Sequence, residues 1–207
     1  MGRLTELSRS LEGARVIVTG AASGMGRATA HLFADEGAKV LVADWNEDGV
    51  AGVVEEIRTA HGSSAAEGLH GDVSRQEDRS AMVERCVTAF GGVDVLVNNA
   101  GISRVSSVFS PEDEFTSNWD ATIAVNLTAQ AHLIRTALPH LMAAPNGGRV
   151  INIASTEAFV ATGGLSAYTA AKHGVVGLTK SFAVELGRHG VTVNAVCPGP
   201  KIGRAHV

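Results

Sequence analysis

The chain has 207 residues, of which 45% are hydrophobic and 18% are charged, a composition typical of a globular protein with one sizeable core. A formal net charge of -4 without a basic stripe argues against nucleic acid or an anionic membrane surface as the main partner. The sequence has no apolar run long enough to span a bilayer, and residues 1–10 lack the apolar centre of a signal peptide. We therefore expect a protein that stays in the cytoplasm.

Cysteine and histidine usage predicts neither a disulfide nor a metal site. Cys86 and Cys197 lie far apart in the sequence, so we expect two buried free thiols. The eight histidines do not show the spacing of a zinc site, and we expect them to be surface or packing residues. The sequence therefore predicts no bound metal.

The first predicted unit is a β-branched strand over residues 15–19, a glycine-rich turn over residues 20–26 and a helix over residues 27–36. Glycines let backbone N–H groups approach a pyrophosphate, and the helix N-terminus adds a favourable dipole. The candidate cofactor-binding residues of this turn are Gly20, Ser23, Gly24, Met25 and Gly26. The alternative is a tight strand-to-helix turn that binds no ligand.

A carboxylate at the end of the second predicted strand, residues 39–43, narrows the choice of ligand. Asp44 follows the glycine turn by about 20 residues, where it can accept hydrogen bonds from an adenosine ribose and would repel a 2′-phosphate. No basic residue stands at Ser23 or Trp45 to receive such a phosphate, so we expect NAD and not NADP. Alternatively, Asp44 is the N-cap of the helix predicted over residues 46–60.

The third and fourth predicted strands, residues 66–71 and 93–97, also end in polar or small residues. Asp72 and Val73 follow the third strand, and Asp72 could hold the adenine amino group; a capping box at residues 74–77 predicts the start of the next helix. The fourth strand leads into a turn whose amides and glycine can lie beside a dinucleotide. The candidates there are Asn99, Ala100 and Gly101, with Asn98 as a structural residue.

One or two helices are predicted over residues 112–142, with Asn126 on an otherwise apolar face. Because a buried amide without a partner is costly, we expect a polar group to meet it. A fifth strand over residues 149–154 then ends at Ser155, whose hydroxyl could donate to a substrate oxygen. The alternative is a serine that only caps the turn.

Tyr168 and Lys172 are four residues apart on a predicted helix, so the ammonium can lie beside the phenol. A nearby cation favours the phenolate, which makes a phenol a plausible acid/base near neutral pH. The alternative is a half-buried tyrosine beside a solvated lysine. A sixth strand over residues 191–196 completes the alternation of strands and helices, which predicts an α/β fold: a Rossmann-type doubly wound parallel sheet with helices on both faces.

With these residues in place, the sequence closely resembles the short-chain dehydrogenase/reductase family, in its shorter single-domain branch of 3-oxoacyl-ACP reductase-like members. The motifs that match occur in order along nearly the whole chain up to Pro200: Thr19-Gly20-x-x-x-Gly24-x-Gly26, Asn98-Asn99-Ala100-Gly101, Asn126, Ser155, Tyr168-x-x-x-Lys172 and Pro198-Gly199. The resemblance implies hydride transfer between NAD(H) and a secondary alcohol, ketone or 3-oxoacyl substrate.

The same resemblance implies a catalytic tetrad of Asn126, Ser155, Tyr168 and Lys172. Tyr168 would be the acid/base, Ser155 would orient and polarise the substrate, and Lys172 would bind the nicotinamide ribose. Asn126 would hold a water in a proton relay, which would also supply the partner of its amide. Tyr168, Lys172 and the Pro198–Gly199 pair would complete the cofactor site, and the full-length form would be a homo-oligomer.

In the family a substrate-covering segment, a seventh strand and a final helix follow the Pro-Gly pair. Residues 201–207 match nothing there, and they can be back-translated as AAG ATC GGA AGA GCA CAC GTC, which looks like a common sequencing adapter. We therefore expect one catalytic domain over residues 1–200 that lacks its last strand and helix, and a non-native tail. The alternative functions are a cofactor-binding fragment with little turnover and a non-catalytic Rossmann-type regulatory protein.

Overall fold

Six apolar segments of the chain pair as parallel strands in the order β3-β2-β1-β4-β5-β6. The structure is a computed structural model that describes residues 10–199; the predicted tail lies outside these residues. The strands are β1 (Arg15–Thr19), β2 (Lys39–Asp44), β3 (Ala66–His70), β4 (Val95–Asn98), β5 (Arg149–Ile153) and β6 (Thr192–Val196). The order reverses where β1 pairs with both β2 and β4, so a crevice is expected beyond the carboxyl ends of β1 and β4.

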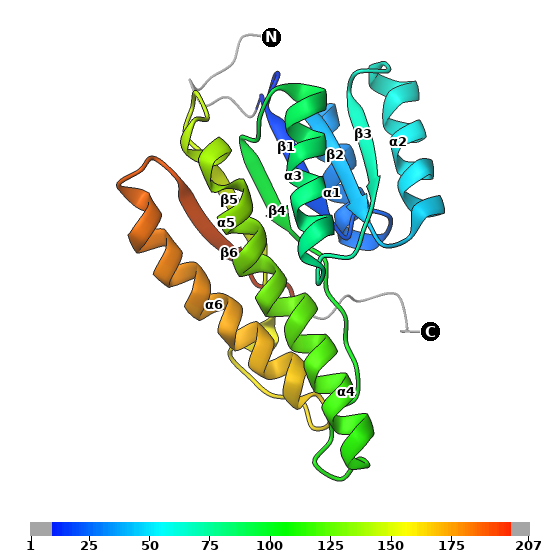
Figure 1. Cartoon of the computed structure of the whole chain (residues 1–207), viewed down its shortest axis with the longest axis vertical. Helices are drawn as coiled ribbons and strands as arrows, with labels where there is room; N and C mark the ends of the chain where they lie inside the picture. The colour runs from blue at the N-terminus through cyan, green and yellow to red at the C-terminus, as the bar shows by residue number, and fades with distance from the viewer. Residues whose placement is uncertain (1–9, 200–207) are drawn as a thin grey trace.

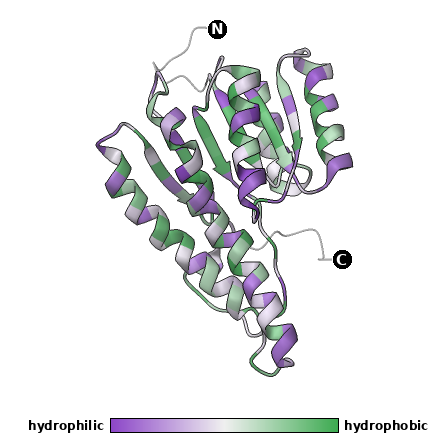
Figure 2. Ribbon diagram, in the orientation of Figure 1, coloured by the Kyte–Doolittle hydropathy of each residue, from purple (hydrophilic) through white to green (hydrophobic). Residues whose placement is uncertain are grey.

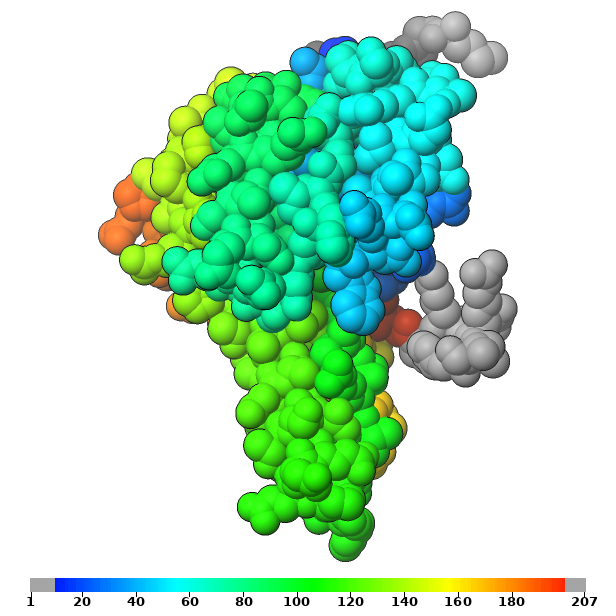
Figure 3. All heavy atoms as spheres, turned by 45° about the vertical axis from the view of Figure 1, so that its right-hand side comes forward, coloured from blue at the N-terminus to red at the C-terminus, as the bar shows by residue number. Residues whose placement is uncertain are grey.

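Helices cover both faces of the sheet, which confirms the predicted Rossmann-type fold (Figure 1). The α3, α5 and α6 helices lie on one face, and α1 lies on the opposite face, with α2 beside it. The bounds of the helices are α1 (Gly24–Asp35), α2 (Glu47–His61), α3 (Gln76–Phe90), α4 (Glu112–Ile123), α5 (Ala129–Met142) and α6 (Ser166–Gly187). Figure 3 shows that α4 projects beyond the body of the sheet as an arm.

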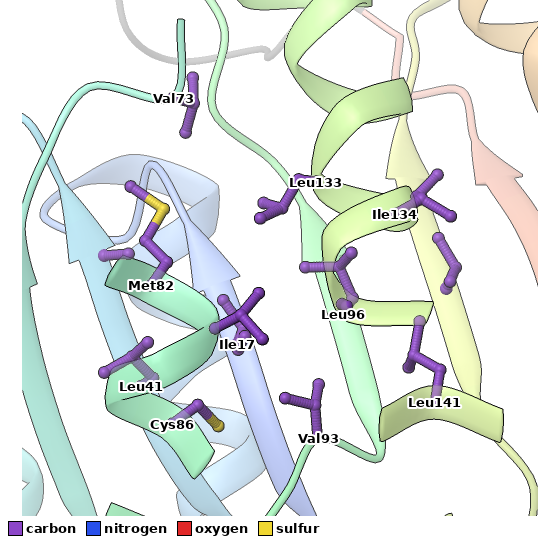
Figure 4. Packing of buried hydrophobic residues seen from close by; sticks show 14 of the residues in the cluster. Ile17, Leu41, Val73, Met82, Cys86, Val93, Leu96, Leu133, Ile134 and Leu141 are labelled. Carbon is purple, nitrogen blue, oxygen red and sulfur yellow. The ribbon is translucent and has the colours of Figure 1, made fainter. Parts of the chain in front are cut away.

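Alternate strand residues feed two separate hydrophobic cores, because successive side chains of a strand point to opposite faces. Ile17 of β1 packs toward α3 and α5, whereas its neighbours Val16 and Val18 pack toward α1 and α2. The first core is drawn in Figure 4, where Met82 of α3 and Leu133 of α5 point toward the central strands. Strands buried on both faces are apolar at nearly every position, as their green colour in Figure 2 shows.

The β6 end of the sheet is covered on one face only. Val193 is buried in the first core, but Thr192, Asn194 and Val196, which point the other way, are exposed. Among the described strands β6 pairs with β5 alone, so its other edge is bare within residues 10–199.

Two predicted helix starts are wrong. The first helix begins at Gly24 and not at residue 27, so two of the three motif glycines lie in its first turn. The capping box is also absent: α3 begins at Gln76 without a side-chain cap, and the Ser74 N–H donates to Asp72 Oδ1 instead (2.8 Å). Asp72 closes an Asx turn with the Ser74 N–H group, and this is the group that Glu77 would bind in a capping box.

The predicted helical region 112–142 is one long helix interrupted by a π-helical turn, η1 (Ala124–Thr128). Cys86 is a buried free thiol as predicted, and burial raises its pKa to about 12, but Cys197 is only half-buried. Residues 10–199 contain no helix that is long and apolar enough to cross a membrane. In the same residues no three His, Cys, Asp or Glu side chains are grouped as metal ligands.

An ion pair between Arg15 and Asp94 joins the amino ends of β1 and β4. The guanidinium donates to both carboxylate oxygens, from Nη2 at 2.6 Å and from Nε at 2.7 Å, and the Arg15 backbone N–H donates to Asp94 Oδ2 at 2.8 Å. Burial opposes ionisation of this carboxyl, but the hydrogen bonds from Arg15 outweigh it and hold the pKa of Asp94 below its ordinary value.

We expect Asp94→Asn to lower the free energy of unfolding at pH 7 by about 1–3 kcal/mol, because the guanidinium then loses a charged acceptor. A depressed carboxyl pKa stabilises the fold above the ordinary value near 3.9, and this stabilisation is lost as the pH falls through the lower folded value. Urea unfolding at pH 7 and pH 3 should therefore show a difference between parent and variant that shrinks in acid. Asp120→Asn on the exposed side of α4 is the control; an effect of equal size there would contradict the assignment.

Candidate active site

A cleft of about 450 Å³ opens beyond the carboxyl ends of β1, β2, β3 and β4. This volume lies within the range of small-molecule and cofactor pockets. The predicted cofactor residues that line the cleft are Gly20, Ser23, Gly24, Met25, Asp44, Asp72, Val73, Asn99, Ala100 and Gly101. Residues that are far apart in the sequence thus line one crevice, at the point where the strand order reverses.

The glycine turn is shaped by conformations and contacts that only glycine allows. Gly20 and Gly24 have φ angles of +65° and +55°. A Cβ on Gly20 would lie 2.7 Å from Ala100 Cα, and a Cβ on Gly26 would overlap the Gly20 carbonyl oxygen. The turn is therefore packed against the neighbouring β4 turn on one side and open to the cleft on the other, and Gly26 supports it from inside α1 without lining the cleft.

Asp44 links the end of β2 to the glycine turn. Its Oδ2 accepts a hydrogen bond from Ala22 N at 3.0 Å, and its Oδ1 accepts from Asn46 N at 2.9 Å. The helix cap is Asn46, whose Oδ1 accepts from Gly49 N, so the alternative that Asp44 caps α2 is wrong. A carboxylate has about four acceptor positions, so the Asp44 oxygens keep capacity for hydroxyl donors in the cleft.

The β1 and β4 turns are joined through Thr19 and Asn99. The buried Thr19 Oγ1 donates to Val97 O and accepts from Asn99 N and Ala100 N, both at 3.1 Å. In return the Asn99 side chain donates to the carbonyls of Thr19 (2.9 Å) and Gly20 (3.0 Å). Asn99 therefore fixes the cleft floor with its amide.

Tyr168 and Lys172 lie on α6, with Lys172 Nζ 5.5 Å from the centre of the phenol ring. Lys172 is 4% exposed and donates to the carbonyl of Ile153 at 2.7 Å. Burial lowers its pKa from 10.5 to about 8. Tyr168 is half-buried in the first turn of α6.

Ser155 stands between β5 and the short 3₁₀ turn η2 (Thr156–Ala158), and its Oγ accepts from Glu157 N at 3.2 Å. The serine therefore does cap the turn, but this bond uses a lone pair and leaves the hydroxyl proton free to be donated. Pro198 and Gly199 run alongside: the Pro198 carbonyl accepts from Thr156 N at 3.0 Å.

Asn126 lies in the π-helical turn and is fully buried. Its Nδ2 donates to Ile102 O and its Oδ1 accepts from Ile102 N, both at 2.8 Å. The expectation that a relay water supplies the partner of this amide is therefore wrong, because the Ile102 backbone satisfies both ends. A Cβ on Gly101 would lie 3.3 Å from Asn126 Oδ1 and 3.8 Å from Lys172 Nζ, so Gly101 lies between these two side chains.

Sequence reasoning missed part of the cleft wall. Trp45 is 71% exposed at the mouth of the cleft, directly after Asp44, and Arg104 lines the side next to Gly101. The position of Trp45 after a strand-end carboxylate could have indicated it, whereas Arg104 comes from an irregular loop that carries no sequence signal. Pro198, Gly199, Tyr168 and Lys172 do not line this cleft.

Comparisons with known proteins agree on one family. A family model described as short chain dehydrogenase matches residues 14–201. The D-beta-hydroxybutyrate dehydrogenase of Cupriavidus necator is 44% identical over 190 residues, which cover 91% of this chain and 71% of that protein. The 3-oxoacyl-acyl-carrier-protein reductase FabG of Thermotoga maritima is 37% identical over 196 residues, covering 91% of this chain and 74% of that protein. The cyclohexanol dehydrogenase of an Acinetobacter species is 39% identical over 183 residues, covering 88% and 71%.

The burial of Lys172 makes a testable contribution to the pH dependence of stability. The pKa of Lys172 is about 8 in the folded state and is taken as 10.5 in the unfolded state. As the pH rises between these values, the folded state has lost this proton and the unfolded state still holds it, so the free energy of unfolding increases. Relative to Lys172→Met, the parent should gain about 2 kcal/mol in free energy of unfolding from pH 7 to pH 9.5. Lys180→Met, at an exposed position of the same helix, is the control and should track the parent; equal pH dependence in both variants would contradict the assignment.

Proposed function

The chain belongs to the short-chain dehydrogenase/reductase family of oxidoreductases, and we propose that it transfers a hydride between NAD(H) and a secondary alcohol or ketone. The observation that carries the proposal is the position of Lys172, whose Nζ lies 5.5 Å from the centre of the Tyr168 ring and beside Gly101, on the helix that follows the Ser155 turn. Ser155, Tyr168 and Lys172 belong to one short loop and one helix, so their spacing is fixed by the fold.

The described residues fit a dinucleotide. The Gly20 turn offers backbone N–H groups at the start of α1, where a phosphate is stabilised by the helix dipole. Asp44 keeps acceptor capacity for the ribose hydroxyls, and Asp72 and Val73 line the adjoining part of the cleft, where an adenine would lie. A carboxylate at Asp44 disfavours a 2′-phosphate, which supports NAD over NADP.

When bound, NAD supplies the hydride acceptor for alcohol oxidation. Lys172 would hold the nicotinamide ribose and, with its positive charge, favour the phenolate of Tyr168. Tyr168 would then take the hydroxyl proton of the substrate, and Ser155 would donate a hydrogen bond to the same oxygen and fix its direction. In the reductive direction the Tyr168 phenol returns the proton to the carbonyl oxygen.

Asn126 takes part in this proposal as a positioning residue. Its amide holds both backbone groups of Ile102 and so keeps the Gly101 turn against α6. The π-helical turn interrupts the helix ladder at this position, a distortion that occurs frequently at functional sites. A relay water at this turn remains a prediction.

Removing the phenol proton tests the acid/base. We expect Tyr168→Phe to lower kcat by about 10²–10⁴-fold, the usual contribution of general acid/base catalysis, with NADH affinity nearly unchanged. Turnover should be followed by NADH absorbance with simple secondary alcohols, and NADH affinity by fluorescence titration. Turnover within tenfold of the parent would remove Tyr168 from the mechanism; NADH binding by the parent without turnover of any alcohol would favour a cofactor-binding protein.

Replacing Asp44 tests the choice of coenzyme. Because Asp44 also binds Ala22 N and Asn46 N, its loss weakens the turn for either coenzyme, and the ratio of NAD to NADP affinity is the meaningful quantity. We expect Asp44→Ala to reduce the NAD preference by about 1–3 kcal/mol, the range for a hydrogen bond to a charged group. Parent affinities that favour NADP would overturn the assignment.

A further inference from the structure

The segment from residue 155 to residue 165 joins the two catalytic elements. It starts at Ser155 and runs into the first turn of α6, which carries Tyr168, so it borders any substrate that contacts both side chains. Figure 1 shows this loop between the lower ends of α6 and α4. Its sequence, STEAFVATGGL, contains a single charged side chain, Glu157.

Glu157 is held in place by hydrogen bonds to both ends of the segment. Its carboxylate accepts from the Thr162 hydroxyl, from Thr162 N at 3.2 Å and from the Thr169 hydroxyl at 2.8 Å. Its backbone N–H donates to Ser155 Oγ. Thr169 adjoins Tyr168 in α6, so Glu157 is hydrogen-bonded to Ser155 and to the neighbour of Tyr168 in the sequence.

The carboxylate carries its negative charge at neutral pH. Hydrogen bonds from Thr162 and then Thr169 lower the pKa of Glu157. Lys172 donates to Ile153 O and Arg104 lines the cofactor cleft, whereas the charge of His173 contributes weakly to lowering the pKa of Glu157. His173, one turn along α6, has its Nδ1 3.0 Å from Thr169 O.

The segment also exposes two large apolar side chains to solvent. Phe159 and Val160 are 67% and 57% exposed, and they follow directly after the turn that Ser155 caps. Across from them, the loop after β4 is joined to the segment by the Ser106–Leu165 bridge and presents Val105 at 55% exposure. Exposed apolar side chains and one fixed carboxylate therefore lie on the two joined loops that adjoin Ser155 and the first turn of α6.

From this juxtaposition we propose, on the basis of the function proposed above, that the substrate is an uncharged, apolar secondary alcohol or ketone and that Glu157 is the specificity residue that excludes hydroxy acids. A carboxylate next to the reacting carbon would approach Glu157 without a free basic partner on the segment. Like charges brought close together in a partly exposed site repel each other, and we expect this repulsion to weaken the binding of a hydroxy acid by roughly tenfold. One relative is a D-beta-hydroxybutyrate dehydrogenase, and another is a cyclohexanol dehydrogenase; the proposal predicts that this chain acts on substrates of the second kind.

The test uses a substrate pair that differs in charge, 3-hydroxybutyrate and its ethyl ester, with the parent and Glu157→Gln. The parent should favour the ester in kcat/KM by at least tenfold. Glutamine can keep the hydrogen bonds to Thr162 and Thr169, because its oxygen accepts and a threonine hydroxyl can accept from its amide. Glu157→Gln should therefore raise kcat/KM for the acid by about tenfold and leave the ester within about twofold.

Thr169→Val is the matched control, because it removes one hydrogen bond of the same carboxylate without changing the charge. It should change both substrates equally. A parent that prefers the acid, or a Glu157→Gln variant in which both substrates change together, would overturn the proposal while leaving hydride transfer intact.

Ligand binding tests the role of Glu157 without any need for turnover. Calorimetric titration of parent and Glu157→Gln with acetoacetate and with ethyl acetoacetate, in the presence of NADH, should show that the substitution strengthens binding of acetoacetate alone by about tenfold. Failure of both ligands to bind to the parent, or equal affinities in both proteins, would refute the role of Glu157. If both proteins bind the two ligands as expected but the parent does not turn over either substrate, the proposed hydride transfer would instead be refuted.

Discussion

The arrangement of the site depends on the hydroxyl of Thr19. Parallel strands end side by side, and each turn that leaves them must be held by groups other than the sheet ladder. Thr19 Oγ1 accepts hydrogen bonds from two backbone N–H groups of the turn after β4, and the Asn99 side chain donates to two backbone carbonyls at the end of β1. Because of these bonds the Gly20 turn and Ala100 can approach so closely that a Cβ has no room between them. The two halves of the cleft floor therefore move as one unit.

From this floor, a chain of contacts leads to the proposed catalytic groups. Gly101, at the end of the same turn, lies against Asn126 Oδ1 and near Lys172 Nζ. Lys172 is buried, the Ile153 carbonyl is its one hydrogen-bond partner within residues 10–199, and burial lowers its pKa to about 8. Retaining a cation in such a place costs stability, which is typical of residues whose charge serves chemistry. The lysine thus ties the end of β5 to α6 and keeps its charge beside the phenol.

Sequence patterns predicted the fold well because the strands are buried on both faces and the turns carry glycine or carboxylate at fixed places. Gly20 and Asp44 could be placed in one crevice from strand order alone, since parallel strands bring their carboxyl ends to the same edge. Local hydrogen bonding was harder to predict. Asp72 takes the N–H group that a capping box would use, and Asn126 meets a backbone segment from another element. The first depends on a choice between two local hydrogen bonds to one N–H group, and the second on a contact between segments 24 residues apart. The role of Glu157 likewise follows from three hydrogen bonds and not from its position in the sequence.

A line of buried polar side chains fixes the rotation of α6 and hence the direction of its proposed catalytic side chains. Asn98 Nδ2 donates to Asn152 Oδ1 at 2.9 Å, and Asn152 Nδ2 donates to Thr179 Oγ1 at 3.0 Å. Buried amides are tolerated only when they are satisfied, so a rotation of α6 that broke this line would leave polar groups orphaned in the core. Thr179 lies seven residues after Lys172, two helical turns along the same buried face. The rotation of α6 about its axis that lets Thr179 accept from Asn152 is therefore also the rotation that points Lys172 toward Ile153. The buried hydrogen bonds of the sheet and the direction of the proposed catalytic side chains thus depend on one another.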